Sequence, residues 1–231
     1  MKTSDLCVVF DLDDTLYLEC EYVASGFEAV GDWCLCNLKM SGVQELAQSL
    51  FQQGQRGNIF DSVVEQIGAQ QPSQTVTEMI RVYREHNPRI AMPVDAIECL
   101  DRLQQRVHLC LLTDGDSRSQ WAKIDALGLR TVFDAIVVTG DWGAEFWKPH
   151  PKGFRHLQMQ VASSKFIYIA DNPAKDFVAP QQLGWGTVRV NRPRSLHHNR
   201  ASGSQPAVFE VRDLDPIPEL LQQLYPSSFL D

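Results

Sequence analysis

The chain has 231 residues, of which 44% are hydrophobic and 22% charged, and its formal net charge is −8 at neutral pH. This composition supports a packed core and excludes wholesale disorder. The acidic balance argues against general binding to nucleic-acid polymers or to membrane surfaces. An anionic substrate would therefore need a metal ion or a few local basic side chains.

Six cysteines are spread over the chain, and no Cys-x-x-Cys pair occurs among them. Several lie in apolar runs, where cysteine behaves as a small hydrophobic residue. We expect reduced thiols in a cytoplasmic protein. The first residues lack the apolar length of a signal peptide, and no run of about 18 apolar residues predicts a membrane span.

The first predicted strand, residues 6–10, leads directly into the acidic segment 11–15, Asp-Leu-Asp-Asp-Thr. In an open α/β sheet, ligands bind beyond the carboxyl ends of the strands. Strand periodicity would direct Asp11 and Asp13 to the same side, and two neighbouring like charges are costly unless a cation or a proton lies between them. The pair indicates a divalent metal site, or one ionised and one protonated carboxyl. The alternative is a solvated turn rich in aspartate.

The following region, residues 17–91, lacks a strand pattern and contains helical stretches near 21–40, 43–53, 59–68 and 73–86. Such a block between two strands indicates an inserted helical subdomain, because long connections without packing of their own are uncommon. A single irregular crossover is the alternative. We therefore assign residues 1–16 and 92–231 to an α/β core and residues 17–91 to the insert.

The rest of the chain alternates strand and helix patterns, which predicts a mainly parallel sheet in a Rossmann-like three-layer core. The further apolar runs of strand length are 107–112, 135–138, 166–170, 186–190 and 207–211. Helical patterns cover 117–127, 151–161 and 215–224. The arginine-rich stretch 191–206, which contains His197 and His198, predicts a mobile surface loop. A minor role in holding an anionic substrate is the alternative.

Polar side chains follow the predicted strands or precede a helix in four places. These are the segment 11–15, Thr113 with Asp114 and Gly115, Lys148, and Asp171 with Asp176. In this order they resemble the motifs of the haloacid dehalogenase superfamily of phosphotransferases: Asp-x-Asp-x-Thr, a Ser or Thr, a Lys and an acidic pair. The resemblance covers essentially the full chain, and the helical insert resembles the type called a C1 cap.

The resemblance implies a Mg²⁺-dependent phosphatase that works through an aspartyl phosphate. Asp11 would be the nucleophile, and Asp13 would be the general acid and then the general base. Lys148 would neutralise charge on Asp11 and on the phosphoryl group. The phosphate-binding residues would be Thr113, Asp114 and Gly115, the last two through backbone N–H groups, and Lys148. The metal-binding residues would be Asp11, Asp13 through its backbone carbonyl, Asp171 and Asp176. The alternatives are a helix-capping Asp176 and a solvated Lys148.

The same resemblance narrows the reaction. Dehalogenases lack the second aspartate, so Asp13 disfavours dehalogenation, and Lys39, the single lysine of the insert, gives little support for a phosphonatase Schiff base. The expected substrate is a small phosphate ester, a nucleoside monophosphate or a sugar phosphate, as in nucleotidase-like members. A phosphomutase and a catalytically silent binding or regulatory member are the alternatives. We expect closure of the cap about joints near residues 16–20 and 88–93. The oligomeric state is left open.

Overall fold

A six-stranded sheet with the order β3-β2-β1-β4-β5-β6 forms the centre of the protein's α/β unit. The computed structural model describes residues 4–198, 200, 201, 203 and 205–229. The strands are β1 (Leu6–Phe10), β2 (His108–Thr113), β3 (Ala135–Val138), β4 (Lys165–Ala170), β5 (Gly186–Val190) and β6 (Phe209–Val211). All five neighbouring pairs are parallel. The predicted α/β fold with a mainly parallel sheet is confirmed.

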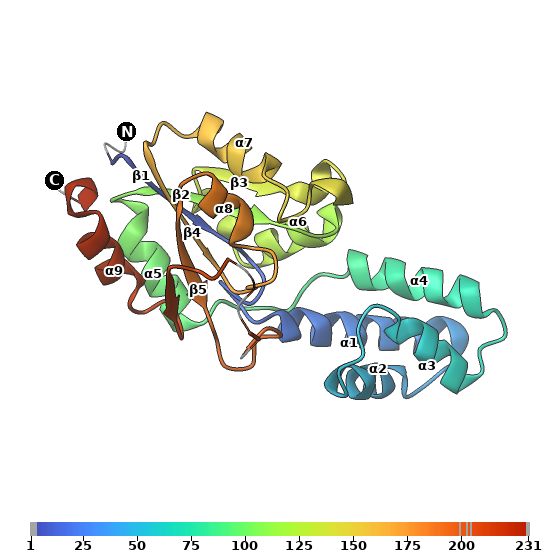
Figure 1. Ribbon diagram of the computed structural model, residues 1–231. Coiled ribbons are helices and arrows are strands. Elements are labelled where there is room, and N and C mark those ends of the chain that lie inside the picture. The colour runs from blue at the N-terminus through green and yellow to red at the C-terminus, as the bar shows by residue number, and fades with distance from the viewer. Residues whose placement is uncertain (1–3, 199, 202, 204, 230–231) are drawn as a thin grey trace. The chain divides into compact units, whose positions relative to one another are not determined.

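The central strand β1 is apolar throughout because it is covered on both faces. All of its side chains are fully buried, as expected for a strand inside a parallel sheet. On one face, Val9 and Leu112 belong to a buried cluster that includes Phe154. The helices of this unit are α5 (Val94–Gln104), α6 (Ser117–Ala126), α7 (Lys152–Gln160), α8 (Val178–Gln182) and α9 (Ile217–Leu224), and Figure 1 shows α7 and α9 on opposite sides of the strands.

A second compact unit, Glu21–Ile90, is inserted in the sequence after β1. Its helices are α1 (Glu19–Leu38), α2 (Val43–Gln52), α3 (Ile59–Ile67) and α4 (Pro72–Glu85), and it contains no strand in residues 21–90, all of which are described. The ring of Phe27 contacts the rings of Phe51, Phe60 and Tyr83. Edge-to-face aromatic pairs of this kind supply much of the core of a small helical unit.

The division between the units falls at residues 20–21 and 90–91. It differs from the predicted insert at the N-terminal end, because Tyr17 remains in the α/β unit. Tyr17 is fully buried there, and its hydroxyl donates a hydrogen bond to Asp13. Among the described residues, no helix combines the length and the apolar character needed to cross a membrane. That the helical unit acts as a cap stays a prediction.

Candidate active site

The acidic pair of the first motif opens into a pocket of about 160 Å³ at the carboxyl ends of three neighbouring strands, β2, β1 and β4. Adjacent parallel strands bring their carboxyl ends to the same edge, which is why segments far apart in the sequence meet there. The pocket is lined by Asp11, Asp13, Glu19, Thr113, Asp114, Gly115, Trp147, Asn172, Lys175, His197 and Asp171. Lys148 and Asp176 are buried next to Asp11 and are not part of this lining.

Lys148 forms the centre of a buried ion network. Its Nζ lies 2.7 Å from Oδ1 of Asp11, 2.9 Å from Oδ1 of Asp176 and 2.8 Å from the hydroxyl of Tyr168. The contacts with Asp11 and Tyr168 are hydrogen bonds, and the contact with Asp176 is an ion pair. Although burial lowers the pKa of Lys148, attraction to Asp11 and Asp176 outweighs it and holds that pKa well above its usual value. Lys148 is therefore a fixed positive charge beside Asp11.

Three carboxylates form the group best suited to a metal ion. Asp11, Asp171 and Asp176 each offer an oxygen, and these oxygens lie within 4.8 Å of one another. Burial raises the pKa of Asp171 well above its usual value, and the like charges of Asp176 and Asp11 raise it further. Within the described part of the chain, Oδ2 of Asp171 is buried without a hydrogen-bond partner. Buried oxygens that repel one another fit a hard divalent cation such as Mg²⁺.

Burial also acts on Asp11 itself. It raises the pKa of Asp11 to about 7, against the lowering effect of Lys148. A carboxyl with a pKa of about 7 changes its protonation state near neutral pH. A second cation beside Lys148 would lower this pKa and keep Asp11 ionised. The site thus gives Asp11 one permanent positive neighbour and room for a metal ion as another.

Asp13 lies in a different environment from Asp11, although only one residue separates them. Its Oδ1 is 2.7 Å from Nζ of Lys123, its Oδ2 accepts a hydrogen bond of 3.0 Å from Nε2 of Gln120, and Tyr17 donates a further bond. Burial alone would raise the pKa of Asp13, but Lys123 and the hydrogen bonds lower it below its usual value. The surroundings therefore shift the pKa values of the two aspartates in opposite directions, which is typical of carboxyl groups with different roles.

Thr113 ends β2 and is almost fully buried, and its hydroxyl accepts a hydrogen bond from Nε2 of Gln120. Gly115 follows with a φ of +132°, a backbone conformation that favours glycine. A Cβ at Gly140 would lie 2.0 Å from the backbone oxygen of Gly115, so glycine is required at both positions of this close approach.

The carboxylate of Asp114 accepts hydrogen bonds from three parts of the site. It accepts hydrogen bonds from the backbone N–H of Lys148, from the Thr139 hydroxyl and from Nζ of Lys175. Although burial raises its pKa, Lys148 and Lys175 lower it below the usual value. A carboxylate held ionised would repel a phosphate, so only the backbone at this position suits the predicted phosphate-binding role.

The prediction of a mobile surface loop for residues 191–206 does not describe its first half well. The backbone N–H of Leu196 donates to Asp14, and Nε of Arg192 donates to the backbone oxygen of Thr15. His197 lines the pocket and its Nε2 lies 2.9 Å from Nδ2 of Asn172. These contacts tie the described part of the loop to the first motif; residues 199, 202 and 204 lie outside the described residues.

Sequence reasoning missed several residues of the pocket region. They are Glu19, Gln120, Lys123, Lys175 and Tyr168. Burial raises the pKa of Glu19 to about 7, and the charge of Asp13 adds to this effect. A signal existed for Gln120 and Lys123, because their i, i+3 spacing places both on one face of the helix that follows Thr113.

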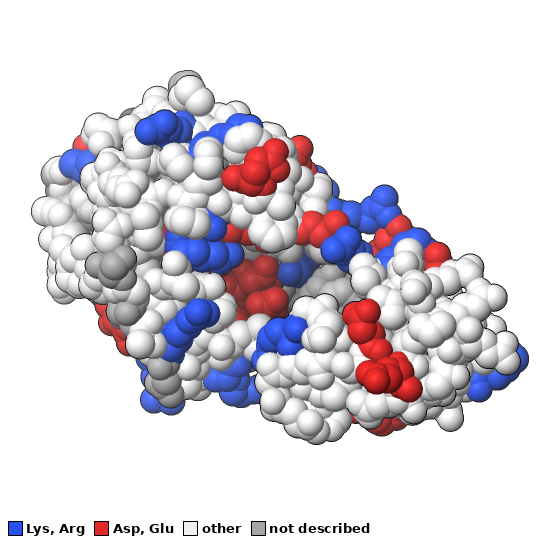
Figure 2. Space-filling view, turned by 45° about the vertical axis from the view of Figure 1, so that its right-hand side comes forward, with Lys and Arg blue, Asp and Glu red and all other residues white. Residues whose placement is uncertain are grey.

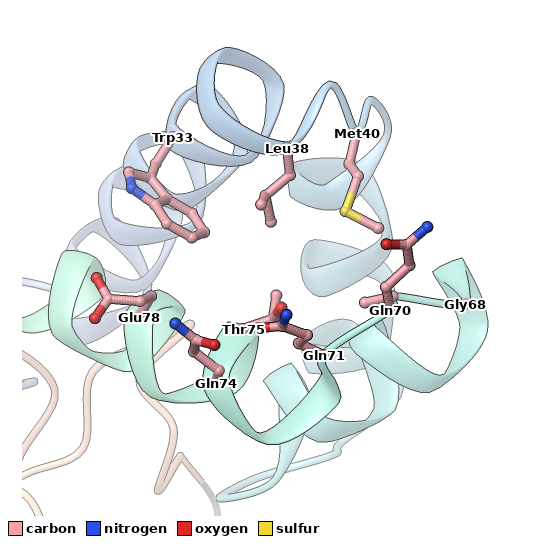
Figure 3. A pocket seen from close by; sticks show the side chains of 10 residues that line it. Trp33, Leu38, Met40, Gly68, Gln70, Gln71, Gln74, Thr75 and Glu78 are labelled. Carbon is pink, nitrogen blue, oxygen red and sulfur yellow. The ribbon is translucent and has the colours of Figure 1, made fainter.

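A second cavity lies in the helical unit and has a volume of about 630 Å³. Figure 3 shows Trp33, Leu38 and Met40 along one side and Gln74, Thr75 and Glu78 along the other. Its lining contains no basic side chain and a single acidic one. Such a lining has no positive charge for a phosphoryl group, and one carboxylate alone does not make a metal site. On the face drawn in Figure 2, basic side chains are mixed with acidic ones instead of forming a continuous basic surface.

Comparison with known proteins agrees with this arrangement. The family described as "Haloacid dehalogenase-like hydrolase" matches residues 8–190. The chain therefore belongs to the haloacid dehalogenase-like hydrolase family, which confirms the identification made from the motifs.

Two curated relatives are named as phosphatases. A glyceraldehyde 3-phosphate phosphatase of Methanocaldococcus jannaschii is 27% identical over 194 residues, which covers 79% of this chain and 83% of that protein. An N-acylneuraminate-9-phosphatase of Rattus norvegicus is 44% identical over 133 residues, a match that spans about half of each chain (56% and 52%).

Solved structures share the fold. The HAD-hydrolase YfnB from Bacillus subtilis, bound to magnesium, superposes with a TM-score of 0.68 at 20% identity and covers 93% of this chain and 97% of its own. A HAD phosphatase from Thermococcus onnurineus gives a TM-score of 0.61 at 22% identity, with 96% and 98% covered.

Proposed function

We propose that the protein is a Mg²⁺-dependent phosphomonoester hydrolase that transfers the phosphoryl group of a small metabolite to Asp11 and then to water. One observation carries the proposal. Among the described residues, Asp11 is the single carboxylate that contacts the buried ammonium of Lys148, belongs to the group of three acids with Asp171 and Asp176, and also lines the pocket. A nucleophile of this kind needs positive charge on it and on the incoming phosphoryl group.

The residues present fit the metal. Asp11, Asp171 and Asp176, with the backbone carbonyl of Asp13, would hold Mg²⁺, which when bound neutralises charge on the carboxylates and on the phosphate. Lys148 supplies the second positive charge, and its other two partners prevent it from moving away from Asp11.

The proposed reaction has two steps. Asp13, a carboxylate in the free protein, takes up a proton when the negatively charged phosphate ester binds beside it. A carboxylate oxygen of Asp11 then bonds to phosphorus as the bond from phosphorus to the ester oxygen breaks, and the departing ester oxygen takes the proton from Asp13. Water then bonds to the same phosphorus and gives a proton to the Asp13 carboxylate, and the bond to Asp11 breaks. Phosphate leaves, Asp13 releases its proton to solvent, and both aspartates return to their starting states. The hydroxyl of Thr113 and the backbone at Gly115 orient the phosphoryl oxygens.

The relatives favour a phosphorylated carbohydrate as the substrate. Two of them are named for glyceraldehyde 3-phosphate and N-acylneuraminate 9-phosphate. The pyrimidine 5'-nucleotidase YjjG of Escherichia coli is 23% identical over 129 residues, a lower identity and a smaller share of this chain than either of these relatives has. A nucleoside monophosphate is the second candidate, supported by that nucleotidase.

The decisive experiment measures phosphate release from p-nitrophenyl phosphate and from a panel of sugar phosphates and nucleoside monophosphates. We expect Mg²⁺-dependent turnover that is lost in EDTA and reduced at least about a thousand-fold in Asp11→Asn. The exposed Asp61→Asn serves as the matched control. Turnover that survives in Asp11→Asn would refute the proposal. Conversion of a sugar phosphate to its isomer without phosphate release would identify a mutase, and absence of any turnover a silent binding member.

A further inference from the structure

Asp13 is enclosed by donors, and two of them come from the same helix, α6. Nζ of Lys123 lies 2.7 Å from Oδ1 of Asp13, while Nε2 of Gln120 lies 3.0 Å from Oδ2. The Lys123 side chain is 6% exposed, less than the 21% of its partner. The two oxygens of the carboxylate are thus fixed separately, one by a charge and one by an amide.

Gln120 has a second contact that links Asp13 to the phosphate-binding segment. The same Nε2 donates to the hydroxyl of Thr113. Helix α6 is itself anchored close to this segment, since Asp116 caps its start by accepting from the backbone N–H of Ser119. One helix face therefore holds the Asp13 carboxyl at a set place relative to Thr113.

A buried ammonium is costly to retain, and an apolar side chain of similar size would fill the position at a lower cost. The charge of Lys123 therefore calls for a functional explanation. Asp13 supplies one, because in the proposed reaction this side chain must face the departing ester oxygen in the first step and water in the second. Its contact of 2.7 Å with Nζ of Lys123 fixes that orientation.

We propose that Lys123 and Gln120 are positioning residues for the leaving-group step: each holds one oxygen of the Asp13 carboxyl, so that the side chain keeps the orientation from which a proton passes to the departing ester oxygen. This inference rests on the proposed function. The proton moves from Asp13 to the leaving oxygen and is replaced from water in the second step. Lys123 keeps all its protons, and the Gln120 amide orients without exchanging any.

The test compares two leaving groups through kcat/KM, which reports the first phosphoryl transfer. p-Nitrophenolate departs without a proton, whereas the alkoxide of a sugar phosphate requires one. For Lys123→Met we expect about a hundred-fold loss of kcat/KM on the sugar phosphate that wild type hydrolyses fastest, and less than about ten-fold on p-nitrophenyl phosphate. Gln120→Leu should show the same split at about a ten-fold loss. Lys123→Arg should recover part of the loss. Equal losses on the two substrates, or no loss, would overturn the inference.

A double-substitution cycle separates action through Asp13 from general damage. In an Asp13→Asn background, adding Lys123→Met should cause no further loss on the sugar phosphate, whereas a second full loss would overturn the inference. Lys165→Met, which removes the partly exposed ion pair with Asp5, is the matched control and should leave the substrate ratio unchanged. If Lys123→Met does not fold, Gln120→Leu carries the test alone. If wild type shows no turnover that depends on Asp11, the proposed function itself is refuted, and not this inference alone.

Discussion

The two units of the protein differ in what they bury. The α/β unit buries charged groups, with Lys148 between Asp11 and Asp176 in a region of almost no solvent exposure. The helical unit buries rings, such as those of Phe27 and Phe51, and its ion pairs lie at the surface. Its cavity is about four times the volume of the α/β pocket (630 against 160 Å³) and has no group for phosphoryl chemistry. We infer from this comparison that buried charge, rather than cavity size, marks the site of the proposed phosphoryl chemistry.

Because of this difference, a substitution at a charged residue should cost less stability in the helical unit than in the α/β unit. An exposed pair such as Arg81 with Glu78 contributes little to stability, because water screens both charges. Removing one member of a buried network leaves the others uncompensated and costs several kcal/mol. The predictions below test this division, starting with the largest expected effect.

Lys148→Met should have the largest effect. It leaves Asp11 and Asp176 without their shared cation, so we expect kcat on p-nitrophenyl phosphate to fall at least about a thousand-fold. The free energy of unfolding without metal should fall by about 3–5 kcal/mol. Steady-state kinetics and urea unfolding measure the two effects. Lys148→Arg should remain impaired, because a planar guanidinium cannot reproduce the three contacts of the ammonium with Asp11, Asp176 and Tyr168. Activity within ten-fold of wild type would contradict the assigned role.

Asp171→Asn should separate stability from activity. Removing one of three mutually repelling carboxylates should raise the melting temperature in EDTA, since burial and like charges disfavour the ionised form of Asp171. The same change should lower Mg²⁺-dependent turnover about a hundred-fold or more and reduce the rise in melting temperature that Mg²⁺ gives wild type. Thermal melts with and without Mg²⁺ provide the measurement. An unchanged Mg²⁺ effect would remove Asp171 from the metal site.

The metal-free protein should lose stability as pH rises from about 4 to about 7. In the unfolded chain Asp11 ionises near its ordinary pKa of 3.8, whereas in the folded protein burial raises that pKa to about 7. Between these values the folded state holds a proton that the unfolded state has released, so rising pH favours unfolding. Asp14, with a pKa raised to about 6, and Glu19, raised to about 7, act in the same direction.

Asp13 and Asp114, whose pKa values are lowered, act below this range. Asp11 alone would lower the free energy of unfolding by roughly 4 kcal/mol between about pH 4 and pH 7. Urea unfolding at several pH values in EDTA measures the slope, and Mg²⁺ should flatten it by favouring the ionised carboxylates. Stability that increases across this range in EDTA would contradict the raised pKa values.

The sheet and the main acidic residues of the site can be predicted from the sequence, but the contacts around these residues cannot. Apolar runs separated by helical patterns predict parallel strands, and Asp11 follows the first run directly, so its place at the sheet edge follows from local pattern. Lys123 is 110 residues from Asp13 in the chain, and nothing local shows that the two meet. His197 lies in a stretch without periodicity, so only tertiary packing brings it to the pocket. The catalytic roles of these residues stay predictions.

The smallest expected effect is in the helical unit. Trp33→Ala opens the wall of the larger cavity, and we expect less than about a two-fold change in kcat/KM for p-nitrophenyl phosphate, because none of the lining groups carries phosphoryl chemistry. Gln74→Ala, which removes an amide from the facing side in Figure 3, should behave alike. The same variants assayed with the preferred sugar phosphate sharpen the comparison. A selective loss on that substrate would assign leaving-group recognition to the helical unit, whereas an equal loss above ten-fold on both substrates would show that buried charge alone does not locate the chemistry.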